Sequence, residues 1–209
     1  MTTFYMVRHG ETEWSRDGNR YCGRSNIALT ENGTHQSNLL AALLHDIPFD
    51  AAVVSPLKRA LSTALPIVQR LGIPMQVDAR LQEIDFGDWE GLTVPEIEAR
   101  FPQQWIDWTT DPVRNRAGGR GESAPEVFNR MTDLLLEQLQ HRTVLIVSHT
   151  TAMRLVMAGT LGMPFCHYRK LEINTADVYV MTMHSIDDVK WKVLNWLTSP
   201  LRLSPVQEP

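Results

Sequence analysis

The 209-residue sequence has few cysteines and no long apolar run. Its two cysteines, Cys22 and Cys166, cannot form a disulfide framework or a zinc site of four cysteines. The longest apolar candidates, such as residues 39–44, fall far short of the ~20 residues of a membrane span. The N-terminal residues also lack a basic region followed by an apolar stretch. These absences predict a protein with no disulfide, signal peptide or membrane contact, and a cytoplasmic location.

The sequence also lacks a basic excess, because it has 20 Lys and Arg residues and 24 Asp and Glu residues, which gives a net charge of −4. Nucleic-acid-binding proteins usually carry a basic excess or a basic stripe, so nucleic acid is not an expected partner. An anionic ligand must therefore be bound by a local arrangement of positive groups. Hydrophobic residues make up 43%, which is ordinary for a globular protein, and the length predicts one domain.

Strand-like runs rich in β-branched and aromatic residues alternate with helical patterns along the chain. The predicted strands are residues 3–7, 51–55, 143–148, 178–183 and 190–196. This alternation predicts an α/β fold, a three-layer α/β/α sandwich with a mostly parallel central sheet. A short polar stretch joins the last two strands, which predicts an antiparallel hairpin at one edge. We assign residues 1–198 to one domain and expect the Pro-containing tail, residues 199–209, to be poorly ordered.

Helices are predicted between the strands, and one of them contains a proline. Residues 56–71 follow Ser55, a capping serine, but Pro66 lies inside this pattern and predicts a kink or break near residues 62–65. The pair Ser123 and Glu126 forms a capping box at the start of a later helix. The other predicted helices are residues 34–45 and a segment that begins after Ser148 and runs to about Leu161.

Two further segments have less regular patterns. Residues 113–122 combine three arginines with three glycines, which is typical of a flexible basic loop. Trp105 and Trp108 lie at roughly helical spacing just before this loop. We interpret them as an apolar helix face packed on the core, with a lid over the substrate as the functional alternative.

Positive side chains follow three predicted strands at the point where each strand ends. Arg8 and His9 follow the first strand, Arg59 comes shortly after the second, and His149 follows the third. In open α/β sheets the ligand crevice lies outside the carboxyl ends of the strands. If these strands are neighbours, their side chains and nearby helix N-termini make a phosphate-sized positive site. We take the other five histidines to be structural.

Hydrolysis of a phosphate ester also needs a carboxyl group, because an alkoxide leaving group must receive a proton. An acidic cluster offers four candidates, and its spacing alone does not choose among them: Glu83, Asp85, Asp88 and Glu90.

Six ordered motifs carry a family resemblance. They are R-H-G-E-T at 8–12, L-T-x-x-G at 29–33, S-P-L-x-R-A-x-x-T-A at 55–64, L-x-E-x-x-F-G-x-W-E-G at 81–91, G-E-S at 121–123 and V-S-H at 147–149. With these motifs the sequence resembles the histidine phosphatase superfamily, the phosphoglycerate-mutase-like family, over nearly the whole chain.

The resemblance implies a role for each matched residue. His9 would be the nucleophile that becomes phosphorylated, and Glu83 the general acid and base. Arg8, Arg59 and His149 would bind the transferring phosphoryl group and neutralise its oxygens. The resemblance implies no metal and no cofactor.

Four positions next to these motifs are expected to contact the substrate, and three of them depart from the family pattern. Ser15 stands where the family often has asparagine, and Cys22 precedes Gly23 where the family has a polar residue and glycine. Thr150 follows the last motif, where the family often has glycine. We expect Cys22 to be a small pocket-wall residue rather than a reactive thiol.

The family contains both phosphatases and mutases. Mutases generally carry a longer insertion between the positions of Glu83 and His149, so the sequence favours a phosphatase, with a cofactor-dependent phosphoglycerate mutase as the alternative. A non-catalytic module that binds a phospho-ligand is a second alternative, against which the complete set of catalytic residues counts.

The expected partner is a small phosphate ester, and a homodimer is left open. The sequence resembles phosphoserine phosphatases, α-ribazole phosphatases and broad-specificity phosphatases alike. Carboxylated substrates such as phosphoserine or phosphoglycerate are expected if one of three loop arginines reaches the pocket: Arg114, Arg116 or Arg120.

Overall fold

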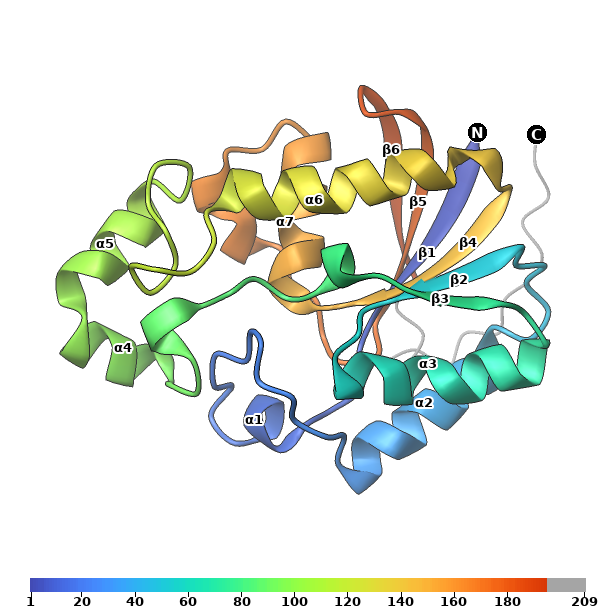
Figure 1. Ribbon diagram of the computed structural model, residues 1–209, viewed down its shortest axis with the longest axis horizontal. Coiled ribbons are helices and arrows are strands. Elements are labelled where there is room, and N and C mark those ends of the chain that lie inside the picture. Colours follow the sequence, from blue (N-terminus) through green and yellow to red (C-terminus); the bar gives the residue numbers. More distant parts are fainter. Residues whose placement is uncertain (195–209) are drawn as a thin grey trace.

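A six-stranded sheet forms the centre of the computed structural model, which describes residues 1–194 (Figure 1). Its strands are β1 (Thr2–Arg8), β2 (Ala51–Val54), β3 (Met75–Val77), β4 (Thr143–Ser148), β5 (Val178–Ser185) and β6 (Asp188–Leu194). The predicted tail, residues 199–209, lies outside the described residues, as does the end of the last predicted strand.

The sheet is mostly parallel with an antiparallel edge, as predicted. The strand order is β3-β2-β4-β1-β5-β6, and the first four of these strands run parallel. β5 pairs antiparallel with β1, and β5 and β6 form the predicted hairpin. The sequence did not predict β3, because its three residues are all exposed and show no buried face.

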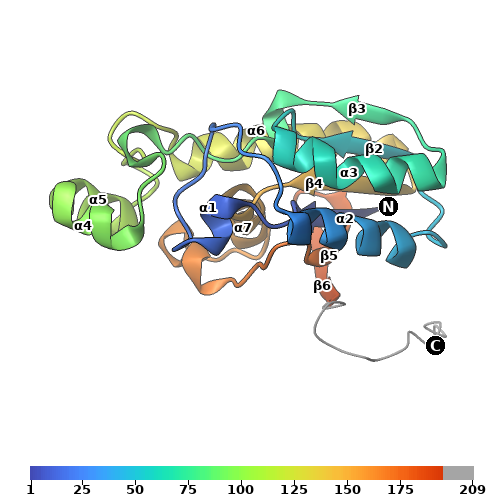
Figure 2. The same ribbon diagram turned by 90° about the horizontal axis from the view of Figure 1, so that it is seen from below.

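Helices cover both faces of the sheet, which confirms the predicted α/β fold (Figures 1 and 2). The helices are α1 (Glu13–Arg16), α2 (Glu31–Leu43), α3 (Lys58–Leu71), α4 (Val94–Arg100), α5 (Pro102–Thr110), α6 (Ala124–Glu137) and α7 (Thr150–Thr160). Short 3₁₀ turns are η1 (Ala79–Leu81), η2 (Gly87–Trp89), η3 (Gln138–Gln140) and η4 (Phe165–Lys170). α2 and α3 lie on one face, α6 and α7 on the other, and α4 and α5 extend beyond the carboxyl ends of the parallel strands.

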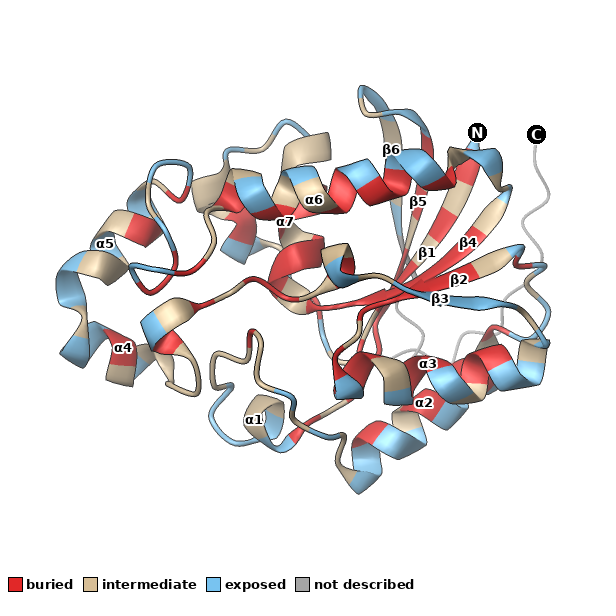
Figure 3. Ribbon diagram, in the orientation of Figure 1, coloured by how far each residue is buried: buried red, intermediate tan, exposed pale blue. Residues whose placement is uncertain are grey.

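The core has two halves that meet at the sheet. Val144 and Ile146 of β4 point to the side of α6 and α7, whereas Leu145 and Val147 point to the side of α2 and α3. Neighbouring residues of a strand face opposite sides, so a strand that is apolar throughout is buried on both faces. β2 and β4, in the middle of the sheet, are accordingly buried over most of their length, whereas β3 at the edge is exposed (Figure 3).

The expected break at Pro66 is wrong, because α3 is helical from Lys58 to Leu71. Pro66 removes one backbone hydrogen bond, but the buried face of the helix, including Ala64 and Ile67, packs on the sheet and holds the helix together. Ser55 also does not cap α3, since the N-cap is Leu57. By contrast, the predicted capping box starts α6.

The basic loop at 113–122 is irregular but closely packed rather than loose. A Cβ added at Gly121 would lie 2.0 Å from the carbonyl oxygen of Asp85, and one at Gly118 would lie 2.0 Å from that of Phe86. These contacts need glycine and fix the loop against the segment that follows η1.

The interpretation of Trp105 and Trp108 as a packed helix face is confirmed. Trp108 is fully buried, and its indole N–H donates to the hydroxyl of Tyr168 at 3.2 Å. Trp105 is half-buried, and its ring lies edge-on to those of Trp89 and Tyr21. The two tryptophans support the wall of the cavity described below.

Candidate active site

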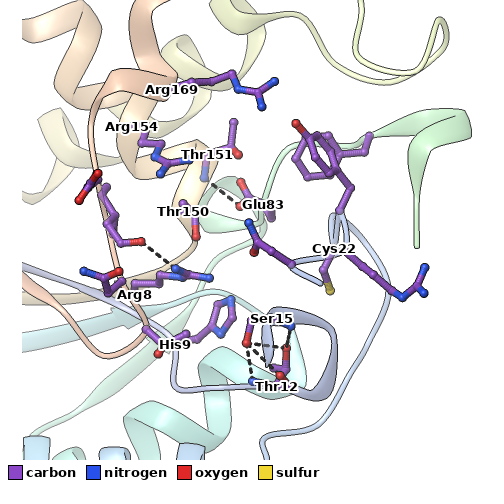
Figure 4. Close-up of a pocket in the computed structure, with 18 of the residues that line it drawn as sticks. Arg8, His9, Thr12, Ser15, Cys22, Glu83, Thr150, Thr151, Arg154 and Arg169 are labelled. Atoms are coloured by element: carbon purple, nitrogen blue, oxygen red, sulfur yellow. Dashed lines mark hydrogen bonds between the residues drawn. The ribbon is translucent and has the colours of Figure 1, made fainter. Parts of the chain in front are cut away.

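A cavity of about 410 Å³ opens at the carboxyl ends of β1 and β4. Arg8, the last residue of β1, and His9 directly after it line the cavity, and Thr150 lines it at the start of α7, which follows β4 (Figure 4). Because β2, β4 and β1 are neighbours, the residues that follow them gather at one edge of the sheet, as predicted.

The hydrogen bonds of the His9 ring define its tautomer. Nδ1 lies 2.7 Å from the carbonyl oxygen of Gly10, which can only accept, so Nδ1 carries the proton. Burial and the nearby charges of Arg59 and Arg8 hold the pKa of His9 well below its usual value. The ring is therefore neutral at pH 7, and its Nε2 carries the lone pair.

Arg59 and His149 lie directly behind His9. The Arg59 Nε–H donates to Nε2 of His9 and to Nδ1 of His149, each at 3.2 Å. Burial, followed by the charge of Arg59, holds the pKa of His149 well below its usual value. His149 Nε2 lies 2.7 Å from the Ser55 hydroxyl and donates its proton there. Both Arg59 and His149 are fully buried and do not line the cavity.

Arg8 is the charged group that the cavity exposes next to His9. One of its terminal nitrogens donates to the carbonyl of Ile173 at 2.7 Å. Burial and the neighbouring Arg154 lower the pKa of Arg8 to about 10, so its guanidinium is still charged at neutral pH.

Glu83 is the acidic residue of its cluster that lines the cavity. Its Oε1 accepts the backbone N–H groups of Ile84 and Ala152 at 2.9 and 2.8 Å, and its Oε2 accepts that of Thr151 at 2.9 Å. Two of these donors belong to the first turn of α7, whose free N–H groups favour negative charge. The carboxyl group is thus held in one orientation beside Thr150.

The other three acids of that cluster have structural contacts instead. Asp85 accepts the N–H of Gly87, Asp88 accepts a hydrogen bond from Arg120, and Glu90 accepts the N–H groups of Gly23 and Ser25. None of the three lines the cavity.

Three of the four expected substrate contacts line the cavity: Ser15, Cys22 and Thr150. The Ser15 hydroxyl forms a capping box with Thr12 at the start of α1. Burial raises the pKa of the Cys22 thiol to about 11, which agrees with a wall residue rather than a nucleophile. Gly23 does not line the cavity, and a Cβ there would lie 2.4 Å from the Ile84 carbonyl oxygen.

The three loop arginines do not line the cavity, so the condition for their contact with substrate is not met. Arg114 is exposed and lies 3.8 Å from Asp111. Arg116 pairs with Glu126, and Arg120 pairs with Asp88. The loop turns these side chains away, since its glycines pack it against residues 85–86.

The cavity contains charged residues that the sequence reasoning missed, chiefly Arg154 and Arg169. Arg154 lies four residues after Thr150 on α7, so the two share a helix face, and this spacing was a signal that could have found it. Arg169 lies on η4, far along the chain from any motif, and no local pattern marks it.

Residues 1–194 contain neither a membrane-spanning helix nor a cluster of metal ligands. No helix there is long and apolar enough to cross a membrane. In the same residues, no three His, Cys, Asp or Glu side chains lie together in a way that could hold a metal ion.

Comparison with known proteins gives one family match and several relatives. Residues 4–198 match the model of the histidine phosphatase superfamily (branch 1). Phosphoserine phosphatase 1 of Hydrogenobacter thermophilus is 33% identical over 196 residues, which cover 92% of each chain. The adenosylcobalamin/alpha-ribazole phosphatase of Escherichia coli is 31% identical over 163 residues, which cover 77% of this chain and 79% of its own. A solved structure of mycobacterial glucosyl-3-phosphoglycerate phosphatase in complex with VO3 has a TM-score of 0.81 at 28% identity, and the match covers 94% of this chain and 99% of that one.

Proposed function

We propose a mechanism from the premise that this chain belongs to the histidine phosphatase superfamily (branch 1) and is a phosphatase. In this proposal the protein hydrolyses a small phosphorylated metabolite through a phosphohistidine on His9. Glu83 acts as general acid and base, and no metal ion takes part. The reaction class follows from the relatives, which are named as phosphatases, whereas the residue roles and the metal independence are our inference.

The tautomer of His9 is the observation that carries the proposal. A histidine can attack phosphorus only with an unprotonated ring nitrogen. The bond from Nδ1 to the Gly10 carbonyl keeps the proton on the far side of the ring, and burial next to Arg59 keeps the ring neutral. Nε2 is therefore available for attack without the help of a separate base.

The transferring phosphoryl group needs positive charge around its oxygens. Arg8 lines the cavity beside His9, and the Nε–H of Arg59 already points at Nε2 of His9. An entering phosphoryl group takes over that N–H at one of its oxygens. His149 offers a lone pair at Nδ1, so it becomes a donor to the phosphoryl group only after it takes up a proton.

Glu83 completes both steps. In the first step Nε2 of His9 attacks phosphorus, the ester bond breaks, and the leaving oxygen receives the proton of Glu83. In the second step water attacks the phosphohistidine, Glu83 takes the proton of that water, and inorganic phosphate leaves. Between the steps the three backbone N–H groups stabilise the charged carboxylate.

A mutase would return the phosphoryl group to a sugar acid instead of water. The relatives reported above are named as phosphatases, which supports hydrolysis for this chain. Turnover of phosphoglycerate with and without a bisphosphate primer separates the two reactions, since a mutase needs the primer and releases no inorganic phosphate.

The nucleophile is tested with His9→Ala, because alanine has no nitrogen to form the intermediate. We expect the variant to lose hydrolysis of p-nitrophenyl phosphate and to lose the acid-labile phosphoryl label, while a chelator leaves the wild type unchanged. His45→Ala, at an exposed histidine, is the matched control. Wild-type turnover in His9→Ala would contradict the mechanism, and inhibition by the chelator would indicate a metal.

The general acid is tested with Glu83→Gln, which keeps the shape of the side chain but cannot donate a proton to the leaving group. Loss of general acid catalysis slows reactions by about 10²- to 10⁴-fold, and we expect the largest effect with alkyl phosphates, whose leaving groups are poor. Asp88→Asn, in the same cluster but outside the cavity, is the control. Equal slowing of kcat/KM, which reports the step in which the leaving group departs, for alkyl and aryl phosphates would exclude Glu83 as the proton donor.

A further inference from the structure

The cavity holds more positive charge than a single phosphoryl group requires. Besides Arg8, its lining includes Arg20, Arg154 and Arg169. Arg20 is paired with Glu96 at 3.0 Å, so it has an acidic partner. Neither Arg154 nor Arg169 has a carboxylate within 4.0 Å among residues 1–194.

Arg154 is half-buried in the cavity wall and is held in a fixed orientation. Its Nε–H donates to the carbonyl of Leu171 at 2.6 Å, which leaves its two terminal NH₂ groups for a ligand. Burial partly dehydrates this side chain and lowers the pKa of Arg154, and the charge of Glu83 opposes that shift only from beyond 4.0 Å. A buried cation in this condition gains most from an anionic partner.

Arg169 is held next to Arg154 by an aromatic ring. Its guanidinium lies over the ring of Trp105, 4.5 Å from the centroid, and Trp105 is fixed by the cluster around Trp89. A cation on an aromatic face keeps its edge free for hydrogen bonds. In the view of Figure 4 both arginines lie across the cavity from His9, with Glu83 between the two ends.

We propose that Arg154 and Arg169 form a second anion-binding subsite that takes the carboxylate of the substrate. This inference rests on the proposed function, in which the phosphoryl group binds at His9. The planar guanidinium fork matches the two oxygens of a carboxylate. The preferred substrates are therefore phosphate monoesters of small carboxylic acids, and a neutral ester leaves Arg154 without a partner.

The size of the cavity agrees with such a ligand. Its volume of about 410 Å³ lies near the lower end of small-molecule sites, which span roughly 300 to 1,000 Å³. Glu172 also lines the cavity, and its charge would attract an ammonium group. The test therefore needs substrates with and without an amino group.

The wild-type protein is tested on two matched substrate pairs that differ only at the carboxylate. Phosphoserine is compared with phosphoethanolamine, and 3-phosphoglycerate, which has no amino group, with glycerol 3-phosphate. We expect kcat/KM to be about 10- to 100-fold higher for the carboxylated member of each pair, the range expected for charged hydrogen bonds. p-Nitrophenyl phosphate is measured in parallel as a reporter of phosphoryl transfer.

The subsite is then tested with Arg154→Gln and Arg169→Ala, each of which we expect to lower that preference about tenfold or more. Arg154→Lys keeps the charge without the fork and should retain part of the preference. Arg114→Ala, an exposed arginine outside the cavity, is the matched control and should keep the wild-type preference. Thermal unfolding of each variant checks that it folds.

The other outcomes contradict either the carboxylate subsite or the proposed function. Equal turnover within both pairs, together with efficient hydrolysis of p-nitrophenyl phosphate, excludes the subsite and leaves the proposed function standing. A wild-type preference that survives both arginine substitutions also excludes it. A stronger preference for a bisphosphate without a carboxylate would mean that the second anion is a phosphoryl group. No hydrolysis of any ester, p-nitrophenyl phosphate included, overturns the proposed function itself.

Discussion

Two neutral histidines side by side are the most consequential residues of the site. The ring centroids of His9 and His149 are 5.1 Å apart, and the guanidinium of Arg59 contacts both rings. A proton on either ring would add a second buried cation beside Arg59, which burial and Coulomb repulsion both oppose. The arrangement that keeps the His9 ring neutral therefore also links folding to pH.

The free energy of unfolding should decrease as the pH falls below about 6.5. Both rings bind protons in the unfolded chain near that pH but not in the folded protein, where their pKa values are lowered. The unfolded state then gains protons, and each ring costs up to about 1.4 kcal/mol of stability per pH unit until its folded-state pKa is reached. Urea unfolding from about pH 7.5 to about pH 5.5 measures this slope.

A matched pair of variants assigns the slope to its residues. His149→Gln should lower the pH dependence of the free energy of unfolding by the contribution of one histidine ring. His45→Gln, at an exposed histidine, should leave it unchanged. An unchanged slope in His149→Gln would mean that other groups cause the acid sensitivity.

At the scale of elements, helix α6 holds the segment that carries Glu83. Arg130 of α6 donates to the carbonyls of Arg80, Gln82 and Glu83 at 2.5, 2.8 and 3.2 Å. Its Nε–H donates to Glu122 at 2.8 Å, and both side chains are mostly buried. One arginine thus joins helix α6 to three backbone carbonyls of residues 80–83, next to the cavity.

Arg130→Met should destabilise the protein by about 3 kcal/mol, because it leaves Glu122 with less compensation and three carbonyls without a donor. Chemical unfolding at neutral pH measures the change. Arg16→Met is the control, since Arg16 pairs with Asp17 on the surface, where single substitutions usually change stability by less than about 0.5 kcal/mol. A loss in Arg130→Met as small as in the control would show that the contacts of Arg130 add little.

At the scale of the whole molecule, the sequence predicted what depends on local pattern and strand direction. The sequence predicted that the residues at the ends of β1, β2 and β4 lie close together, because parallel strands end at the same edge of the sheet. β3 was not predicted, because all its residues are exposed and show no apolar face. The predicted break at Pro66 was wrong, because the packing of α3 on the sheet outweighs the loss of one backbone hydrogen bond. These differences arise from tertiary contacts that no local window contains.

The site was predicted less completely than the fold, for a similar reason. Motif residues such as His9 and Glu83 lie in the cavity, but the distant wall formed by Arg154 and Arg169 depends on how η4 folds back over α7. The full burial of Arg59 likewise follows from the loop carbonyls of Cys22 and Gly23 that close over it. Only Arg154, four residues after Thr150 on α7, could have been found from the spacing of residues along the chain.

The position of β4 between β1 and β2 has a consequence for how the protein folds during its synthesis on the ribosome. β1 and β2 are made early, yet they never touch as paired strands, because β4 separates them. His149 and two of the three N–H donors for Glu83 come from the chain just after β4. Until β4 has left the ribosome, the growing chain lacks the central strand of the sheet and therefore cannot form a complete active site. Phosphatase activity during translation would therefore appear in a single late step rather than gradually.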